Sequence, residues 1–180
     1  MRDSREVISE CSRAIISVHG GNTSEAYSHA KRARSLLNKL RKSAEGQVAR
    51  YLIPPEAEFV EASAVISISK SRPIPTRSAL NVSPEAYLLG LLDTVGELKR
   101  MVLDSLMHDD IAKAQRAFSM MEQLYMACSP LAVYDHVVSG ARRKIDVARM
   151  LVEDTRGFMT EELRREALVS SMGRLQKKLG

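Results

Sequence analysis

The sequence predicts an all-α protein, a single-domain bundle of about seven helices spanning residues 1–180. Leu, Ala, Glu, Lys, Arg and Met are good helix formers and dominate the chain, whereas the alternation of β-branched residues that is typical of strands is scarce. Hydrophobic residues make up 44% and charged residues 27%, close to the averages of globular proteins, so we expect one folded core.

The first two helices are predicted on either side of a glycine pair. From Arg2 to Val18 apolar residues recur at helical spacing, and the sequence HGG ends the run as a glycine C-cap would. Asn22 or Thr23 can cap the second helix, which carries a stripe of Ala and Leu. This helix is expected to run into the region of Gly46.

Prolines mark the starts of the next two helices. Pro54 and the proline after it fit only at the first turn of a helix, which then continues to about Lys70. The segment NVSPEAYLLGLLDTVGELKRMVLDSL opens with Ser83 as a cap and Pro84 at the first helical position. Because this helix is strongly apolar as far as His108, we expect it to be central to the core.

Three further helices are predicted in the C-terminal part of the chain. Each begins at a residue that can cap a helix or at a proline suited to a first turn. The predicted helices run from Asp109 or Asp110 to Cys128, from Ser129 and Pro130 to Arg156 and Gly157, and from Thr160 to the end.

The charge of the chain and its first residues bound its location and partners. A formal net charge of +5 and a pI near 9.4 are compatible with a polyanionic partner. The first residues, MRDSREV, carry charge where a secretory signal would be apolar, and no apolar run approaches the ~20 residues that span a bilayer. We therefore expect a cytoplasmic protein without a membrane partner.

The sulfur and imidazole side chains are assigned no chemistry. Cys11 and Cys128 lie far apart and form no CxxC pair, so we expect reduced thiols in the core. The histidines share no spacing that would build a metal or general-base site, so we expect them at the surface or at helix caps. The histidines are His19, His29, His108 and His136.

Carboxylates are concentrated on two of the predicted helices. In the segment EAEFVEA, Glu58 and Glu61 lie three residues apart and share a helix face that borders the apolar stripe, while Glu56 points elsewhere. In the helix after Ser83, Asp93 and Glu97 lie four residues apart, beside a glycine that permits close approach.

Spacing alone leaves two interpretations of these acids open. Like charges near a core cost free energy unless a cation or a proton offsets them, and facing helices with acidic pairs are typical of the metal sites of helical bundles. Alternatively, Arg100 pairs with Glu97 and Asp104 in a surface ladder of ion pairs.

The segment AYLLGLLDTVGELKR, residues 86–100, resembles the signature of the translin and translin-associated factor X (Trax) family. ARYLIPPEAEFVEA resembles the Trax stretch in which an arginine precedes a helix with E-[YF]-V-E-A, SREVISECSRAI resembles the first helix of the family, and VEDTRG is similar to a later helix end. The resemblance covers nearly the whole chain.

This resemblance implies a seven-helix fold, binding of single-stranded RNA and DNA, and assembly into hollow oligomers, commonly octamers. The Trax branch is a magnesium-dependent endoribonuclease, whereas translin lacks the acids and binds without cutting. Glu58 and Glu61 match the glutamates of E-[YF]-V-E-A, and Asp93 and Glu97 match the acids of the Y-L-L-G helix. The chain therefore resembles the catalytic branch, of the type found in archaea and bacteria.

The resemblance implies that all four acids are catalytic and metal-binding residues. Glu58, Glu61 and Asp93 are expected to be ligands, and Glu97 either a ligand or a base. Mg²⁺ prefers oxygen ligands and retains several waters, so carboxylates from two rigid helices suit it, with Mn²⁺ as a possible substitute. A bound ion would orient the phosphate and activate water.

Four basic residues are expected to contact nucleic acid. Arg50 matches the arginine of a family segment that resembles F-H-R in Trax, although the two residues before it differ from that pattern. The other three lie in and beside the proline-rich stretch SRPIPTRS, which contains Arg72 and Arg77 and follows Lys70 directly. The alternative interpretation of these three residues is an ordinary solvated surface. Because the chain has no Trp and few other aromatic residues, recognition of the backbone rather than of bases is expected.

Three functions remain to be distinguished. The first is a Mg²⁺-dependent endoribonuclease acting on single-stranded RNA inside an oligomeric shell. The second is a translin-type protein that holds single-stranded RNA or DNA without cutting it, its acids serving only in salt bridges. The third is a metal-storing or purely structural bundle, which would not bind RNA at all.

Overall fold

The computed structural model describes residues 2–43 and 51–179, and within these ranges it contains helices and no strand, which confirms the all-α prediction. Arg50 lies outside the described residues. The helices, in chain order, are α1 (Arg2–His19), α2 (Thr23–Ser43), α3 (Ile53–Ser69), α4 (Arg77–Leu80), α5 (Pro84–Leu106), α6 (Ile111–Cys128), the 3₁₀ segment η2 (Ser129–Tyr134) and α7 (Ala141–Leu179).

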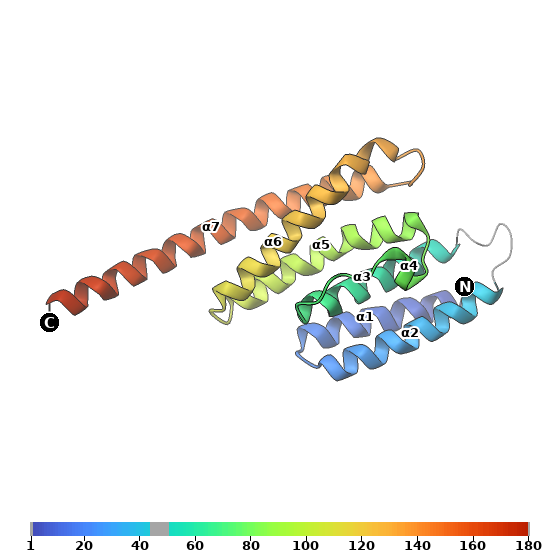
Figure 1. Cartoon of the computed structure of the whole chain (residues 1–180), viewed down its shortest axis with the longest axis horizontal. Helices are drawn as coiled ribbons and strands as arrows, with labels where there is room; N and C mark the ends of the chain where they lie inside the picture. The colour runs from blue at the N-terminus through green and yellow to red at the C-terminus, as the bar shows by residue number, and fades with distance from the viewer. Residues whose placement is uncertain (1, 44–50, 180) are drawn as a thin grey trace.

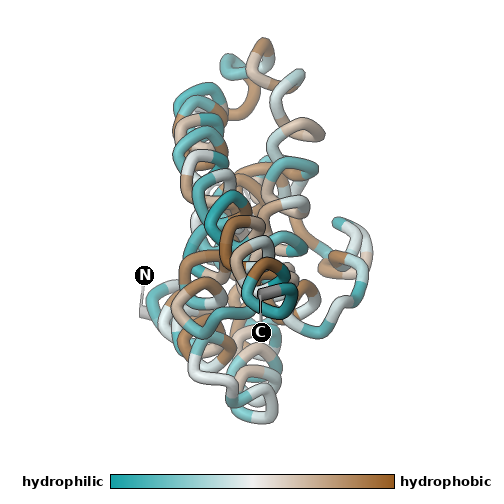
Figure 2. The backbone as a smooth tube through the Cα atoms, turned by 90° about the vertical axis from the view of Figure 1, so that its left-hand side faces the viewer, coloured by the Kyte–Doolittle hydropathy of each residue, from teal (hydrophilic) through white to brown (hydrophobic). Residues whose placement is uncertain are grey.

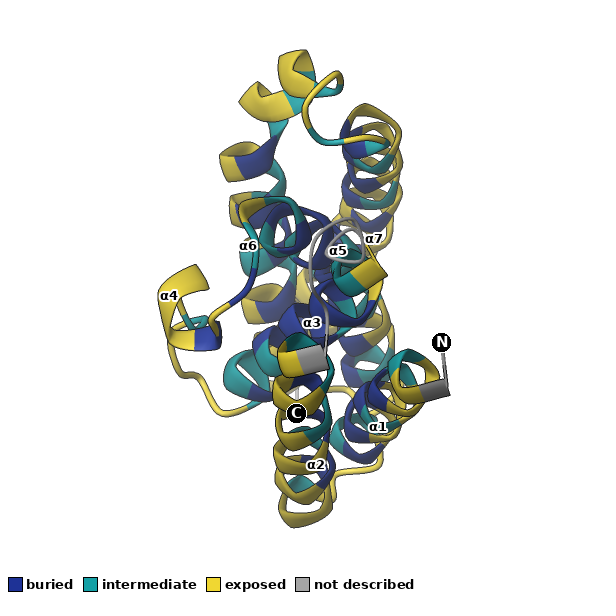
Figure 3. Ribbon diagram, turned by 90° about the vertical axis from the view of Figure 1, so that its right-hand side faces the viewer, coloured by how far each residue is buried: buried dark blue, intermediate teal, exposed yellow. Residues whose placement is uncertain are grey.

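The two central helices of the bundle are α3 and α5. α3 packs against α1, α2 and α5, while α5 also packs against α6 and α7. Figure 1 shows the α1–α2 pair on one flank of this centre and the α6–α7 pair on the other. In Figure 3 the buried residues concentrate on α3 and α5, with α4 and α6 on one side of the molecule and α1 and α7 on the other. The prediction of a central helix after Ser83 is confirmed.

Side-chain caps begin several helices at the predicted places. The hydroxyl of Ser83 accepts a hydrogen bond from the backbone N–H of Ala86 at 3.2 Å, and a carboxylate oxygen of Asp110 accepts one from Lys113 at 2.9 Å. The proline-rich stretch also contains the single turn α4, which the sequence did not predict. Its cap is Thr76.

A close contact between backbones brings α3 and α5 together at Gly90. A Cβ atom at this position would lie 2.3 Å from the carbonyl oxygen of Ala57 and 2.7 Å from the Cβ of Val60. Only glycine therefore permits this approach without displacement of the α3 backbone. The expected close approach at this glycine is made by a neighbouring helix.

The last two predicted helices are wrong, because the structure has one long helix in their place. Residues Ser129–Tyr134 form only a 3₁₀ segment, and α7 runs without a break through Gly157 and Thr160. The hydroxyl of Thr160 donates to the carbonyl of Arg156 at 2.8 Å instead of capping a new helix. A lone glycine among good helix formers weakens a helix without ending it.

The C-terminal half of α7 projects beyond the other helices (Figure 1). Figure 2 shows hydrophobic and hydrophilic positions alternating along α7 toward the C-terminus. More than half of the surface of several apolar side chains in this segment is exposed. They are Leu168, Val169, Met172 and Leu175. Within the described ranges no helix combines the length and the hydropathy needed to cross a bilayer.

Candidate active site

The four predicted acids lie on the two central helices. Glu58 and Glu61 are on α3, and Asp93 and Glu97 are on α5. Glu61 is buried, with 9% of its surface exposed, whereas the other three are half-buried. The contact at Gly90 holds α3 and α5 together, so the two acidic pairs lie on helices that pack directly against each other.

The acids are close enough to alter each other's ionisation. Burial, and then the negative charges of Asp93, Glu58 and Glu97, raise the pKa of Glu61 to about 8. Burial and the charge of Asp93 also raise the pKa of Glu58. The four acids are therefore near enough for their negative charges to repel one another.

A lysine from α7 reaches this region. The ammonium group of Lys144 contacts the carboxylate of Asp93, and both side chains are about one-third exposed. Its positive charge acts to lower the pKa of Glu58 and of Glu61. Lys144 was not singled out from the sequence, because it belongs to an ordinary-looking basic run and only the packing of α7 brings it to the acids.

A histidine from the end of α1 holds the fourth acid. His19 Nε2 lies 2.7 Å from Glu97 Oε2, its Nδ1 lies 3.1 Å from Asp104 Oδ2, and its side chain is 5% exposed. The hydrogen bond from His19 is the main cause that lowers the pKa of Glu97. Each ring nitrogen of His19 thus lies within hydrogen-bonding distance of one carboxylate of α5.

These contacts correct two expectations from the sequence. His19 is a buried bridge rather than a surface or capping residue, and His29 is buried too, with Nδ1 2.7 Å from Glu10. The proposed ladder around Arg100 is replaced by the bridge through His19, while the exposed Arg100 adds a positive charge that lowers the pKa of Glu97. Helical spacing gave no signal for either histidine, because their partners lie on other helices or other faces.

Glu56 has a separate structural function at the start of α3. Nε and Nη2 of Arg41 both donate to its Oε1, at 3.0 and 2.9 Å, and the backbone N–H of Ser83 donates to its Oε2 at 2.9 Å. This buried carboxylate therefore ties α2, α3 and the start of α5 together. As expected, it does not share the face of Glu58 and Glu61.

The donor set is chemically suited to Mg²⁺, because it offers carboxylate oxygens from two rigid helices. In the part of the chain that the structure describes, no three His, Cys, Asp or Glu side chains are already gathered as ligands. Asp93 and Glu97 instead contact Lys144 and His19. The residues thus fit the ion by their chemistry, and holding it would require side-chain movement.

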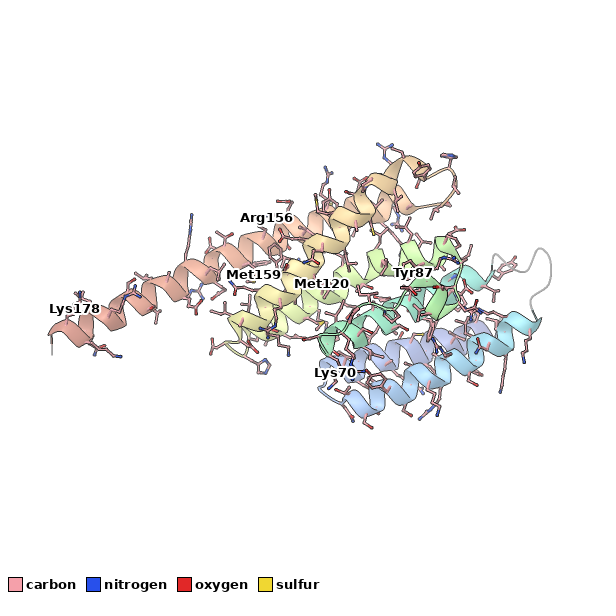
Figure 4. The ribbon with its side chains drawn as sticks, in the orientation of Figure 1. Lys70, Tyr87, Met120, Arg156, Met159 and Lys178 are labelled. Atoms are coloured by element: carbon pink, nitrogen blue, oxygen red, sulfur yellow. The ribbon has the colours of Figure 1, made fainter. Side chains whose placement is uncertain are left out.

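Of the basic residues predicted to contact nucleic acid, Lys70 and Arg72 lie at the C-terminal end of α3, and Arg77 lies on α4. Figure 4 labels Lys70, the exposed C-cap of α3. At 1.5 Å per residue it lies roughly 13 Å beyond Glu61 along the helix axis. Arg77 begins α4 and donates from Nη1 to the carbonyl of Val82 at 3.3 Å. The structure therefore does not gather these residues around the acids.

Arg72 lines a groove of about 600 Å³ between the end of α3 and α6. Lys113 and Arg116 of α6 line the same groove, and its described lining contains no Asp or Glu. Ile68, Met101 and Met120 contribute apolar surface to it. Lys113 and Arg116 were missed from the sequence, because a groove between separate helices leaves no periodic signal.

Comparisons with known proteins agree in fold and sequence. The family model described as the Translin family matches residues 47–154. An uncharacterised protein of Methanocaldococcus jannaschii is 31% identical over 178 residues, which cover 96% of this chain and 79% of that protein.

Solved structures of proteins called C3PO are similar to this chain. A crystal structure of AfC3PO and a structure of its complex with duplex RNA each give a TM-score of 0.80 at 30% identity, covering 89% of this chain and 85% of that one. Apo-NeC3PO gives a TM-score of 0.76 at 22% identity, covering 88% and 85%, and so supports the fold alone.

Proposed function

Because the chain belongs to the translin family, we propose that it is a metal-dependent endoribonuclease of the Trax type that cleaves single-stranded RNA. The observation that carries the proposal is the placement of two acids on α3 and two on the adjoining helix α5, where burial and then the charges of the neighbouring acids raise the pKa of Glu61 to about 8. The AfC3PO complex contains duplex RNA, which supports RNA as the class of ligand. The single-stranded substrate rests on the resemblance of the acidic motifs.

In this proposal the surroundings of each acid determine whether it acts as a metal ligand or as a base. Glu58, Glu61 and Asp93 hold Mg²⁺, with Mn²⁺ as a substitute, while Glu97 is a further ligand or accepts a proton. His19 fixes the carboxylate of Glu97 through a 2.7 Å hydrogen bond and keeps it ionised. When bound, the cation supplies charge neutralisation at the scissile phosphate and activation of the attacking water.

RNA binding is proposed to use the groove beside α6. Arg72, Lys113 and Arg116 place three cations on its lining, and each can contact a phosphate without sequence preference. Lys70 lies at the nearby end of α3 and extends this basic surface. Arg77 is a further candidate, and Arg50, which lies outside the described residues, stays a candidate through the resemblance alone. DNA of the same strandedness offers the same phosphates and is a second ligand to test.

The projecting half of α7 is proposed to contact other copies of the chain in a hollow oligomer, an octamer by analogy with the family. Its apolar side chains Leu168 and Met172 are 61% and 62% exposed, which is unfavourable for a monomer in water. Light scattering coupled to gel filtration tests this assembly. Leu168→Glu with Met172→Glu should reduce the measured mass, and an unchanged mass would remove α7 from the interface.

The enzyme proposal is tested by incubating the purified chain with end-labelled single-stranded RNA and Mg²⁺, with and without EDTA. Cleavage should require the ion, and Glu61→Gln and Asp93→Asn should each abolish it. The exposed acid Asp3 of α1 provides the control substitution Asp3→Asn. Equal cleavage by the parent and both active-site variants would exclude Glu61 and Asp93 from catalysis and overturn the proposal.

The contacts of Lys144 and His19 favour one alternative, a translin-type binding protein. Two of the four acids already have cationic or hydrogen-bonding partners, as salt bridges in such a protein would require. RNA that stays intact in Mg²⁺ or Mn²⁺ but shifts in a gel in a salt-sensitive manner would identify this function. A metal-storing or structural bundle would give no shift.

A further inference from the structure

We propose that Lys144 is a resident counter-cation of the acidic site, which a divalent ion must displace from Asp93 before it can bind there. Lys144 would then set the ion concentration at which the site fills. The inference rests on the proposed function, because it assumes that the acids hold an ion.

The geometry around Lys144 allows such a displacement. Its ammonium group contacts Asp93 across the α5–α7 interface, and its side chain is 31% exposed. The next residue, Ile145, is buried in the core, so the α7 backbone is anchored at this point. The flexible lysine stem can therefore withdraw into solvent without movement of the helix.

The charges that face Lys144 explain why a cation is needed there. Glu58 and Glu61 approach from α3, Asp93 and Glu97 from α5, and on the α1 side His19 carries a bridge to Glu97. Lys144 influences both glutamates of α3 in addition to the aspartate it contacts. Since an ammonium and a divalent ion would both offset this negative charge, the two compete for one position.

A second lysine–aspartate pair across the same two helices provides a matched control. Lys99 of α5 contacts Asp154 of α7, with the residue types exchanged between the helices. Its ammonium lies 5.8 Å from the ring centroid of Phe158 rather than among the four acids. Removing Lys99 thus removes one α5–α7 ion pair without changing the charge at the candidate active site.

The test is a Mn²⁺ titration of the full chain at fixed pH and salt, followed by the electron paramagnetic resonance signal of the free ion. Lys144→Met should bind Mn²⁺ about tenfold more tightly than the parent, because one positive charge near a divalent ion is removed. Lys99→Met should match the parent. Binding by Lys144→Met that is unchanged or weaker would overturn the inference.

Lys144→Arg keeps the charge and pairs with carboxylates through two N–H groups, so it should bind Mn²⁺ no more tightly than the parent. This variant keeps the inference testable if Lys144→Met does not fold, as judged by circular dichroism. Mn²⁺ binding by Lys144→Arg that is about tenfold tighter than the parent would contradict it.

The same titration separates failure of this inference from failure of the proposed function. If the parent binds Mn²⁺ and Asp93→Asn abolishes binding, but Lys144→Met gives the parental affinity, only the counter-cation is wrong. If neither the parent nor Lys144→Met binds Mn²⁺, both the counter-cation and the metal site are wrong. Binding by Lys144→Met alone would support the inference in its strongest form.

Discussion

His19 Nε2 and Glu97 Oε2 lie 2.7 Å apart, although the two residues are separated by 78 positions in the chain. The contact joins the last residue of α1 to one of the four acids on the central helices. The hydrogen bond orients the carboxylate of Glu97 and lowers its pKa. We therefore expect His19 to affect both the stability of the fold and the activity of the site.

His19→Ala should lower the free energy of unfolding by about 2 kcal/mol, because it removes hydrogen bonds to charged groups. The cleavage rate per folded molecule should fall about tenfold to a hundredfold, since Glu97 loses the group that orients it. His29→Ala is the control, because His29 makes an equally short contact with Glu10 instead. Equal losses of rate in the two variants would show that His19 acts only through the fold.

Glu61 should make the stability of the metal-free protein depend on pH. Its pKa is raised from 4.5 to about 8, so between these values the folded state keeps a proton that the unfolded state has released. Stability should therefore fall as the pH rises from about 4.5 through 8. Glu61→Gln should remove this decline and be more stable than the parent at pH 8.5, by on the order of 2 kcal/mol.

Urea denaturation in EDTA across this pH range measures the difference. Glu166→Gln, a change at an exposed acid of α7, should follow the parent at every pH. A Glu61→Gln variant that loses stability with pH as steeply as the parent would assign the decline to other groups. Addition of Mg²⁺ should reduce the decline in the parent, because the ion favours the ionised carboxylates.

Gly90→Ala should destabilise the protein by about 3 kcal/mol, because its Cβ would lie 2.3 Å from the carbonyl oxygen of Ala57. Gly96→Ala on the same helix is the matched control. Apart from its chain neighbours and the backbone of its own helix turns, no atom lies within 4 Å of a Cβ added there, so this change should stabilise the protein by about 0.5–1 kcal/mol through helix propensity. Equal melting temperatures of the two variants would contradict the tight α3–α5 contact.

Arg116→Gln should weaken the binding of single-stranded RNA by the same factor whatever the RNA sequence, because the contact it removes is to a phosphate. The slope of the logarithm of affinity against the logarithm of salt concentration should decrease by about 0.7 for each phosphate that the protein no longer neutralises. Lys31→Gln, on the exposed face of α2, is the control and should keep the parental slope. If the two variants give the same slope, the groove beside α6 is not the RNA surface.

The features that could be predicted from the sequence are those that depend only on residues a few positions apart, such as helix caps and helix faces. Ser83 and Asp110 cap helices because a side-chain oxygen meets an N–H three residues later, and this spacing is visible in one segment. The faces of Glu58 and Glu61 also follow from helical periodicity. Lys144 and His19 could not be predicted in the same way, because their contacts depend on how α7 and α1 pack against the central helices.

The prediction of two separate helices at the C-terminal end was wrong for a different reason. Gly157 and Thr160 look like a helix end and a new cap, but each is tolerated inside a helix when its neighbours favour helix formation. In α7 the hydroxyl of Thr160 is satisfied by the carbonyl of Arg156. Local signals for a break compete with propensity, and the outcome is decided over the whole length of the helix.

The backbone contact between Gly90 and Ala57 also determines the register of α3 on α5. Successive residues of an α-helix are rotated by about 100° around its axis. One residue inserted between Ala57 and Glu58 would therefore rotate both glutamates by more than a quarter of a turn away from α5. Relatives that keep the acids should thus keep the same number of residues between the glycine-facing alanine and the glutamates, whatever the length of their loops.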